Sequence, residues 1–212
     1  MDSIPQHMLD ATRWLLWKYE QRSGKPSKVP YQITGQKASS TDPDHWVSYD
    51  EAVDALERQK HYDGLGYSLT GDSLVGVDLD DCIKLDGELY AWAQEIVNAV
   101  PGYAEISPSG KGVKIFATGS WVCSRHRADA PDGGHIEVYD EGRYFTVTGN
   151  AIQPTGLPTV CGGLDWLADE YFPPAAPEPL PLDSVPVVDY HSMLPNERLT
   201  RASRYADAYP GA

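Results

Sequence analysis

Two carboxylates, Asp78 and Asp80, close an apolar run and are separated by one residue. In a β-strand, residues at i and i+2 point to the same face, so the two acids lie side by side. Like charges this close repel each other and are costly to remove from water. A divalent cation such as Mg²⁺ or Mn²⁺ relieves both problems, because it takes hard oxygen ligands and brings compensating charge. The pair therefore predicts a metal site. The alternative is a strand that runs into a polar turn, with Asp80 or Asp81 capping the next segment.

A second segment suits a phosphate chain. A turn rich in Ser, Pro and Gly precedes a strand-like apolar run and offers the hydroxyls of Ser107 and Ser109 and the backbone amides near Gly110. Lys111 and Lys114 lie beside them, and such amides, hydroxyls and ammonium groups together bind phosphate. The segment is not a Walker A loop, because the spacing differs and no helix obviously follows. The alternative is a glycine-rich hairpin turn with solvated lysines.

A third segment, residues 136–149, predicts two strands joined by a tight turn at 140–142. Glu137 lies on the first predicted strand and Arg143 begins the second, so an acid and a permanent cation face a common region. The alternative for these two side chains is an ordinary cross-strand ion pair, which contributes little at a surface.

In this order, the three segments resemble the catalytic motifs of the archaeo-eukaryotic primase superfamily. The closest resemblance is to the primase-polymerase domains that open phage- and plasmid-type replication proteins. Asp78 and Asp80 match the first motif, the Ser-rich turn and Lys114 the second, and Glu137 with the following Arg143 the third. The resemblance covers roughly residues 13–150, because it also includes four upstream segments: 14–18, 28–31, 37–43 and 64–67.

The resemblance implies a template-dependent nucleotidyltransferase, a DNA primase and DNA polymerase, that adds nucleotides to a 3′-hydroxyl. Its implied cofactors are two Mg²⁺ or Mn²⁺ ions held by Asp78, Asp80 and Glu137. Its implied partners are a DNA template, single-stranded or primed, and nucleoside triphosphates. The residues expected to bind the triphosphate are Ser107, Ser109, Gly110, Lys111, Lys114 and Arg143. Lys28 and the turn at 39–41 are candidate contacts to nucleotide or template, although each is equally well explained as a plain loop residue.

One position departs from the family pattern. The second motif usually ends in a His that contacts the nucleotide's phosphates, and here that position is Lys114. Lysine still binds phosphate as a point cation, but it does not titrate near neutral pH as an imidazole does. A second reading therefore stays open: a non-catalytic nucleotide- or nucleic-acid-binding module with a degenerate primase fold. A metal-dependent phosphohydrolase fits the acids but explains the Ser-Gly turn and Arg143 less well.

Composition bounds the class of protein. The 212 residues include 41% hydrophobic residues, 13 Tyr and 6 Trp, enough for a packed domain with appendages. No apolar stretch approaches the ~20 residues of a membrane span, so no membrane partner is expected. Three widely spaced cysteines without a Cys-x-x-Cys pair favour reduced thiols in a cytosolic setting, and argue against structural zinc. The resemblance implies the cytoplasm of a bacterial or phage-infected cell.

The net charge of −14 is the main evidence against a nucleic-acid enzyme, because non-specific affinity for nucleic acid comes largely from Lys and Arg. Distribution matters as well as the sum. The basic residues gather in residues 13–37 and 111–143, which flank the predicted site. We therefore expect weak, salt-sensitive binding of the template.

Apolar periodicity predicts helices over 48–59, with Ser48 as the cap, over 88–100 and over 163–171. Strands are predicted at 14–19, 29–33, 65–69, 73–79, 103–106, 112–117, 136–139 and 144–148. Those at 65–69 and 73–79 are expected to form a hairpin around residues 71–72. The lack of a regular βαβ rhythm favours an α+β fold. The resemblance implies an RNA-recognition-like primase catalytic core with a small N-terminal α/β module.

Three parts are expected along the chain. Residues 1–172 form the primase-polymerase domain and 173–190 a proline-rich linker, too stiff for a helix and poor in donors for a sheet. Residues 191–212 begin a helical accessory segment that ends abruptly, so we expect an N-terminal piece of a longer protein. The resemblance implies a helicase-like region C-terminal to it.

Overall fold

The computed structural model describes residues 3–154, 156–157 and 162–174. The chain divides into two units, Met1–Pro173 and Pro174–Ala212, and every described helix and strand belongs to the first. Nearly all of the expected proline-rich linker and the whole of the expected terminal helix lie outside the described residues. No described helix is long and apolar enough to cross a membrane.

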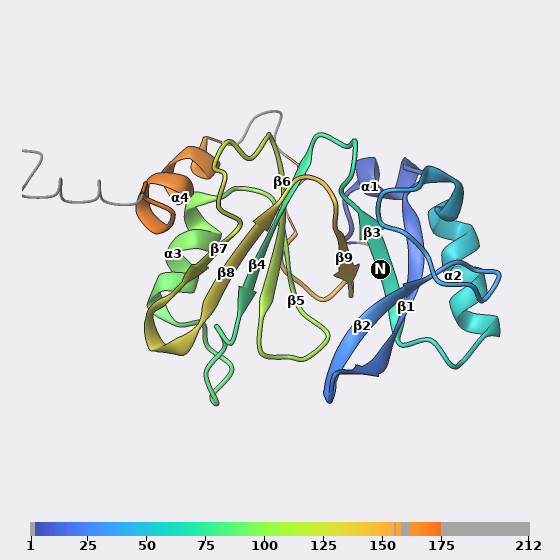
Figure 1. Cartoon of the computed structure of the whole chain (residues 1–212). Helices are drawn as coiled ribbons and strands as arrows, with labels where there is room; N and C mark the ends of the chain where they lie inside the picture. The colour runs from blue at the N-terminus through green and yellow to red at the C-terminus, as the bar shows by residue number, and fades with distance from the viewer. Residues whose placement is uncertain (1–2, 155, 158–161, 175–212) are drawn as a thin grey trace, which may run out of the picture. The chain divides into compact units, whose positions relative to one another are not determined.

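Antiparallel strands form two sheets in the described part of the chain (Figure 1). The four-stranded sheet has the order β2-β1-β3-β9, with β1 Trp14–Arg22, β2 Lys25–Tyr31, β3 Gly64–Ser68 and β9 Tyr144–Val147. The six-stranded sheet has the order β10-β5-β6-β4-β8-β7. Its strands are β4 Leu74–Asp80, β5 Tyr103–Ile106, β6 Val113–Thr118, β7 Arg127–Asp129, β8 His135–Tyr139 and β10 Ala151–Pro154.

The helices are few and short: α1 Gln6–Asp10, α2 Tyr49–Arg58, α3 Ala91–Ala99 and α4 Gly163–Tyr171, with 3₁₀ turns at Pro43–His45 and Pro131–Gly133. The predicted cap of α2 is present, because the Ser48 hydroxyl accepts from the Glu51 amide and the Glu51 carboxylate accepts from the Ser48 amide. Antiparallel sheets with separate helices make the fold α+β, as predicted.

Alternation along β4 separates two cores. Val75, Val77 and Leu79 point to one face, where they are buried beneath α3 and α4. The opposite face of the six-stranded sheet packs against the four-stranded sheet, through aromatic residues such as Phe116 and Phe145. Helix α2 packs on the four-stranded sheet as well, against the face that carries Leu16, Leu65 and Phe145. One face of β4 is therefore apolar and helix-covered, and the other is free to carry polar side chains between the sheets.

Both predicted hairpins are wrong. Strands β3 and β4 are consecutive but do not pair, because β3 lies between β1 and β9 whereas β4 lies between β6 and β8. Strands β8 and β9 also belong to different sheets. The turns at 69–73 and 140–143 therefore carry the chain from one sheet to the other. The turn residues marked the chain reversals correctly, but the strands on either side of each turn pair with other strands.

Close packing between the sheets depends on Gly76 in β4. A Cβ atom at this position would lie 2.5 Å from Cε2 of Phe145 and 2.8 Å from Cδ1 of Leu69. These distances are shorter than any ordinary van der Waals contact, so the missing side chain is what lets β9 lie against β4. The contact is two residues from Asp78 along the same strand face.

Candidate functional site

Five charged side chains lie in register across the six-stranded sheet. Pairing places Glu105 opposite Lys114, Lys114 opposite Asp78, Asp78 opposite Glu137, and Glu137 opposite Arg127. Directly opposite residues share a face of an antiparallel sheet. We call this set the charged row. It lies on the face that meets the four-stranded sheet, because the Lys114 ammonium is 4.6 Å from the centroid of the Phe145 ring in β9.

Asp78 is at the centre of the charged row. Its Oδ2 accepts a hydrogen bond from the Lys114 ammonium. The side chain of Lys114 is 5% exposed and that of Asp78 is 19% exposed, so water screens the pair only weakly. Oδ1 of Asp78 is buried and has no hydrogen-bond partner. An unpartnered buried carboxylate oxygen is costly, and it marks a place where a further donor or a cation would be favourable.

The Glu137 carboxylate makes only long contacts with its neighbours. One carboxylate oxygen lies 3.5 Å from the Arg127 guanidinium, and the other accepts from the Tyr139 hydroxyl at 3.2 Å. The ion pair between Glu137 and Arg143 that remained as an alternative is not formed. Arg127 takes that place, because β7 rather than β9 pairs with β8.

A pocket of about 180 Å³ opens between the two sheets at the centre of the charged row. It brings together four predicted site residues, Asp78, Lys114, Glu137 and Arg143, which are distant in sequence. The complete lining is Lys28, Asp78, Lys114, Glu137, Tyr139, Arg143, Tyr144, Phe145 and Thr146. An adjoining hollow of about 390 Å³ shares Tyr139 and Arg143 with it.

Arg143 reaches this pocket from the crossover into β9. Its guanidinium carbon is 4.7 Å from the centroid of the Tyr139 ring, a cation–π contact. The turn before it is fixed from both sides, because the Gly142 amide donates to the Thr70 hydroxyl and the Ser40 hydroxyl donates to the Gly142 carbonyl. A guanidinium stacked on a ring and fixed at its base keeps its donors free for an anion.

Asp80 lies one row further along, at the exposed end of β4 and opposite His135. Surrounding protein atoms shield its carboxyl from water, and this desolvation raises its pKa, as do the negative charges of Asp78 and Glu137. Asp81 follows in a turn with φ of +51°.

The Ser-rich turn lies beside Asp80 rather than in the pocket. A Cβ atom at Gly112 would lie 3.2 Å from Ser107 Oγ and 3.6 Å from Asp80 Cα, so the turn and the end of β4 are adjacent. Its groups mainly bind one another: Ser107 Oγ is 3.0 Å from Ser109 Oγ, and the amides of Gly110 and Lys111 are bound within the turn. The predicted phosphate cradle here would have to exchange these bonds for bonds to a ligand.

Lys28, only a weak candidate in the sequence, lines the pocket from β2. Partial burial lowers the pKa of its ammonium, and the nearby Lys114 cation lowers it further. Lys28 makes no ion pair within the described residues. Tyr144 fixes the strand beside it, since the Tyr144 hydroxyl donates to the Lys28 carbonyl at 2.8 Å. Arg127 was missed at the level of sequence, because no pattern predicted β7.

The donor set of the pocket partly fits a divalent cation. Carboxylate oxygens of Asp78 and Glu137 are the hard ligands that Mg²⁺ and Mn²⁺ prefer, and Oδ1 of Asp78 is without a partner. In the described residues, however, no three His, Cys, Asp or Glu side chains are arranged to hold a metal ion together. The cation that contacts Asp78 in this arrangement is Lys114.

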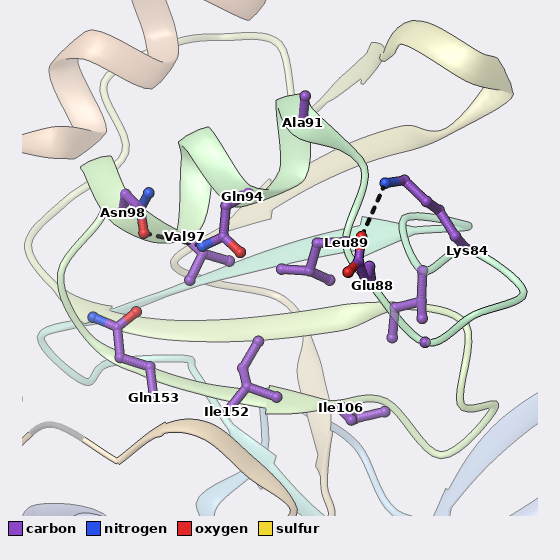
Figure 2. Close-up of a pocket in the computed structure, with 12 residues that line it drawn as sticks. Lys84, Glu88, Leu89, Ala91, Gln94, Val97, Asn98, Ile106, Ile152 and Gln153 are labelled. Carbon is purple, nitrogen blue, oxygen red and sulfur yellow. Dashed lines mark hydrogen bonds and ion pairs between the residues drawn. The ribbon is translucent and has the colours of Figure 1, made fainter.

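A larger cavity, of about 700 Å³, lies on the other side of the six-stranded sheet. Figure 2 shows it between α3, which carries Gln94 and Asn98, and the strand that carries Ile152 and Gln153. Its floor is aliphatic, and its one close ion pair joins Lys84 to Glu88 at 3.7 Å among the residues drawn. None of the predicted site residues lines it, and it lacks the converging acids and cations of the smaller pocket.

Cys82 follows the acid pair and is completely buried. Burial raises the pKa of its thiol to about 12, so the thiolate is scarce at neutral pH. Cys123 is also a free thiol, and Cys161 lies outside the described residues. Neither of the two described cysteines forms a disulfide in the described part of the chain.

Comparison with known proteins agrees with the motifs. No protein-family model matches the chain. A DNA primase-polymerase of Nitratiruptor phage NrS-1 is 38% identical over 144 residues, which are 66% of this chain and 19% of that protein. The chain thus spans about a fifth of the length of this relative. The resemblance to phage primase-polymerases, predicted from the motifs, is confirmed by this match.

Proposed function

We propose that this chain carries the nucleotidyltransferase site of a DNA primase-polymerase, built on an RNA-recognition-like primase core. The observation that carries the proposal is the unpartnered Oδ1 of Asp78 in a pocket lined by the cations Lys28, Lys114 and Arg143. Acids that take a metal, surrounded by cations that take phosphates, are what transfer of a nucleotidyl group requires.

In this proposal Asp78, Asp80 and Glu137 hold the divalent ions. Mg²⁺ or Mn²⁺ held there would stabilise the attacking 3′-hydroxyl oxygen and the leaving pyrophosphate oxygen. The raised pKa of Asp80 is consistent with this role, because a carboxyl crowded by other carboxylates gains from a nearby positive charge. Lys114 already engages Oδ2 of Asp78, so Oδ1 is the oxygen left for an ion.

The cations bind the triphosphate. A pocket of about 180 Å³ is small for a whole nucleotide, so we assign it to the phosphates and the adjoining hollow to the sugar and base. Arg143 lines both, and it offers a planar fork of donors suited to phosphate oxygens. Lys28 adds an ammonium without an ion-pair partner among the described residues.

The test is incorporation of labelled nucleotide on a primed and on an unprimed DNA template, with Mg²⁺ or Mn²⁺. We expect extension by the wild-type chain and none by Asp78→Ala or Asp80→Ala. Asp81→Asn removes the same charge from the exposed turn, keeps a side chain that tolerates φ of +51°, and serves as the control, with extension near that of wild type. Wild-type extension by Asp78→Ala would show the assignment to be wrong.

A second function is favoured by one observation. The ammonium on Oδ2 of Asp78 already neutralises the acid that catalysis would need. In a non-catalytic nucleotide-binding module, this pair would be permanent and the pocket would bind the triphosphate alone. Nucleotide binding without extension under any divalent metal would establish this alternative.

A further inference from the structure

The β1–β2 hairpin concentrates positive charge in an acidic protein. Residues 18–37 contain five Lys and Arg and a single acid, Glu20, in a chain of net charge −14. Glu20 is itself engaged, because it accepts from the Tyr31 hydroxyl and forms an ion pair with Lys37 at 3.2 Å. The other four cations of this segment, Lys18, Arg22, Lys25 and Lys28, form no ion pair within the described residues.

The hairpin tip holds two of these cations in an unfavourable arrangement. Residues 21–26 are all exposed, and Arg22 lies directly opposite Lys25 in the strand register. Like charges directly opposite destabilise a strand pair. Neither side chain forms an ion pair within the described residues. Such a pair is relieved by a polyanion that contacts both.

One face of the hairpin carries an exposed aromatic ring beside the pocket. Tyr19 lies directly opposite Lys28, so the two side chains share the face on which Lys28 enters the pocket. The Tyr19 ring is 45% exposed. Trp17, on the same face, packs against it edge to face at 5.2 Å between ring centroids. The indole of Trp17 is fixed by its bond to the Leu65 carbonyl, so Tyr19 is an aromatic ring supported from one side and open on others.

We infer that the β1–β2 hairpin binds a single-stranded nucleic acid as it approaches the pocket. A base stacks on Tyr19 on one face, and phosphates contact Arg22 and Lys25, whose side chains alternate to the other face at the exposed tip. The Lys and Arg residues of the hairpin favour a polyanion, and the exposed ring of Tyr19 favours a polyanion that carries planar bases. Continuity with the pocket through Lys28 favours a nucleic acid strand over other polyanions. The inference rests on the proposed function and names the surface that receives its template or primer.

The experiment measures fluorescence anisotropy of a labelled oligothymidylate with the chain at several salt concentrations. Tyr19→Leu keeps an apolar side chain but removes the ring, and we expect about tenfold weaker binding, with Tyr19→Phe close to wild type. An abasic oligonucleotide of the same length should bind wild type and Tyr19→Leu equally. Equal losses on both oligonucleotides, or no loss on either, would overturn the stacking role.

The charge is tested by the double variant Arg22→Gln, Lys25→Gln. We expect the slope of log K against log salt to fall by about 1.4, roughly 0.7 for each lost phosphate contact. The matched control is Arg58→Gln, Lys60→Gln, which removes the same charge at the end of α2 and should leave the slope unchanged. Equal effects of both double variants would show that net charge, not this surface, governs binding.

Primer extension separates the two levels of the proposal. If wild type extends a primed template while the hairpin variants bind and extend as wild type does, the hairpin surface is wrong and the proposed function stands. If wild type neither binds the oligonucleotide nor extends a primer, the proposed function itself fails.

Discussion

Two acids of the charged row differ in how the fold treats them. Glu105 is completely buried, and its carboxylate accepts from the Tyr103 hydroxyl at 2.7 Å and from the amides of Thr148 and Gly149 at 2.9 Å each. Asp78, two positions away in the row, has one oxygen bound by Lys114 and one with no partner. The fully bonded acid anchors the connection between β9 and β10, whereas the half-bonded acid faces the pocket.

The difference distinguishes a buried charge that supports the fold from one that is left able to bind a ligand. A buried charge is tolerated when donors from the backbone satisfy it, and Glu105 meets this condition. Asp78 does not, because burial of its remaining oxygen costs free energy that a bound ligand would offset. Substitutions at the two acids should therefore affect different properties of the chain.

The largest effect is expected at Asp78. Asp78→Asn should lower nucleotide incorporation by about 1,000-fold, because stabilisation by bound metal is worth several kcal/mol. It should also leave the Lys114 ammonium without its partner and reduce stability. The double variant Asp78→Asn, Lys114→Met removes both charges, and we expect its melting temperature to return to near the wild-type value without recovery of activity. Recovery of activity in the double variant would contradict the assignment of Asp78 to activity rather than to stability.

Glu105 should show the opposite behaviour, a loss of stability. Glu105→Gln replaces an acceptor oxygen by a donor against backbone amides, and we expect a loss of about 2–3 kcal/mol in the free energy of unfolding, measured by urea titration. Thr148→Ala removes a neighbouring side chain but keeps the amide, and should cost much less. A Gln variant as stable as wild type would show that these bonds do not anchor the loop.

The pH dependence follows from burial, which raises the pKa of Glu105 above its ordinary 4.5. Between these two values the folded chain holds a proton that the unfolded chain has lost, so this group's contribution to stability falls as pH rises. The stability difference between wild type and Glu105→Gln should therefore shrink as pH rises above 4.5 toward the raised pKa. Parallel stability curves for the two proteins over that interval would contradict the burial argument.

Arg143 should give a smaller effect, confined to nucleotide handling. Arg143→Ala should lower kcat/KM by about tenfold, through a higher KM and a lower kcat, because one charged hydrogen bond to phosphate is lost in both the ground and the transition state. Arg143→Lys should recover part of it. Unchanged kinetics would show that Arg143 does not bind the nucleotide and that its role is limited to the contact with Tyr139.

Lys114 gives the smallest and most diagnostic effect. As a permanent cation it should leave nucleotide affinity constant between about pH 6 and 8, whereas Lys114→His should bind about fivefold tighter at the acid end, where an imidazole of ordinary pKa near 6.5 is charged. Lys114→Ala should bind more weakly throughout. Equal affinities of wild type and Lys114→Ala, in a nucleotide titration, would confine Lys114 to its pair with Asp78.

Local signals in the sequence predicted local structure well. Ser48 marked the start of α2, residues 163–171 gave the bounds of α4, and alternation in β4 assigned Asp78 and Asp80 to one face. Those features depend on a few neighbouring residues. Strand pairing does not, so turn residues at 71–72 and 140–142 suggested hairpins where the chain instead changes sheets.

The candidate site was predicted in part for the same reason. Glu137 and Arg143 were expected to share a region, and they do, although from different sheets rather than across a hairpin. The engagement of Asp78 by Lys114 needed the β4–β6 register, which no local pattern gives. Without the same register, the sequence could not predict that the Ser107–Lys111 turn lies outside the pocket.

Gly76 has a consequence for how the chain tolerates change. Since even a methyl group there would overlap the Phe145 ring, replacement would force β9 away from β4 and shift Arg143 at the head of β9. In a mutational scan, this position without a side chain should be as intolerant as the acid two residues later. A pattern used to search genomes for further chains of this design should therefore require the glycine together with the acids.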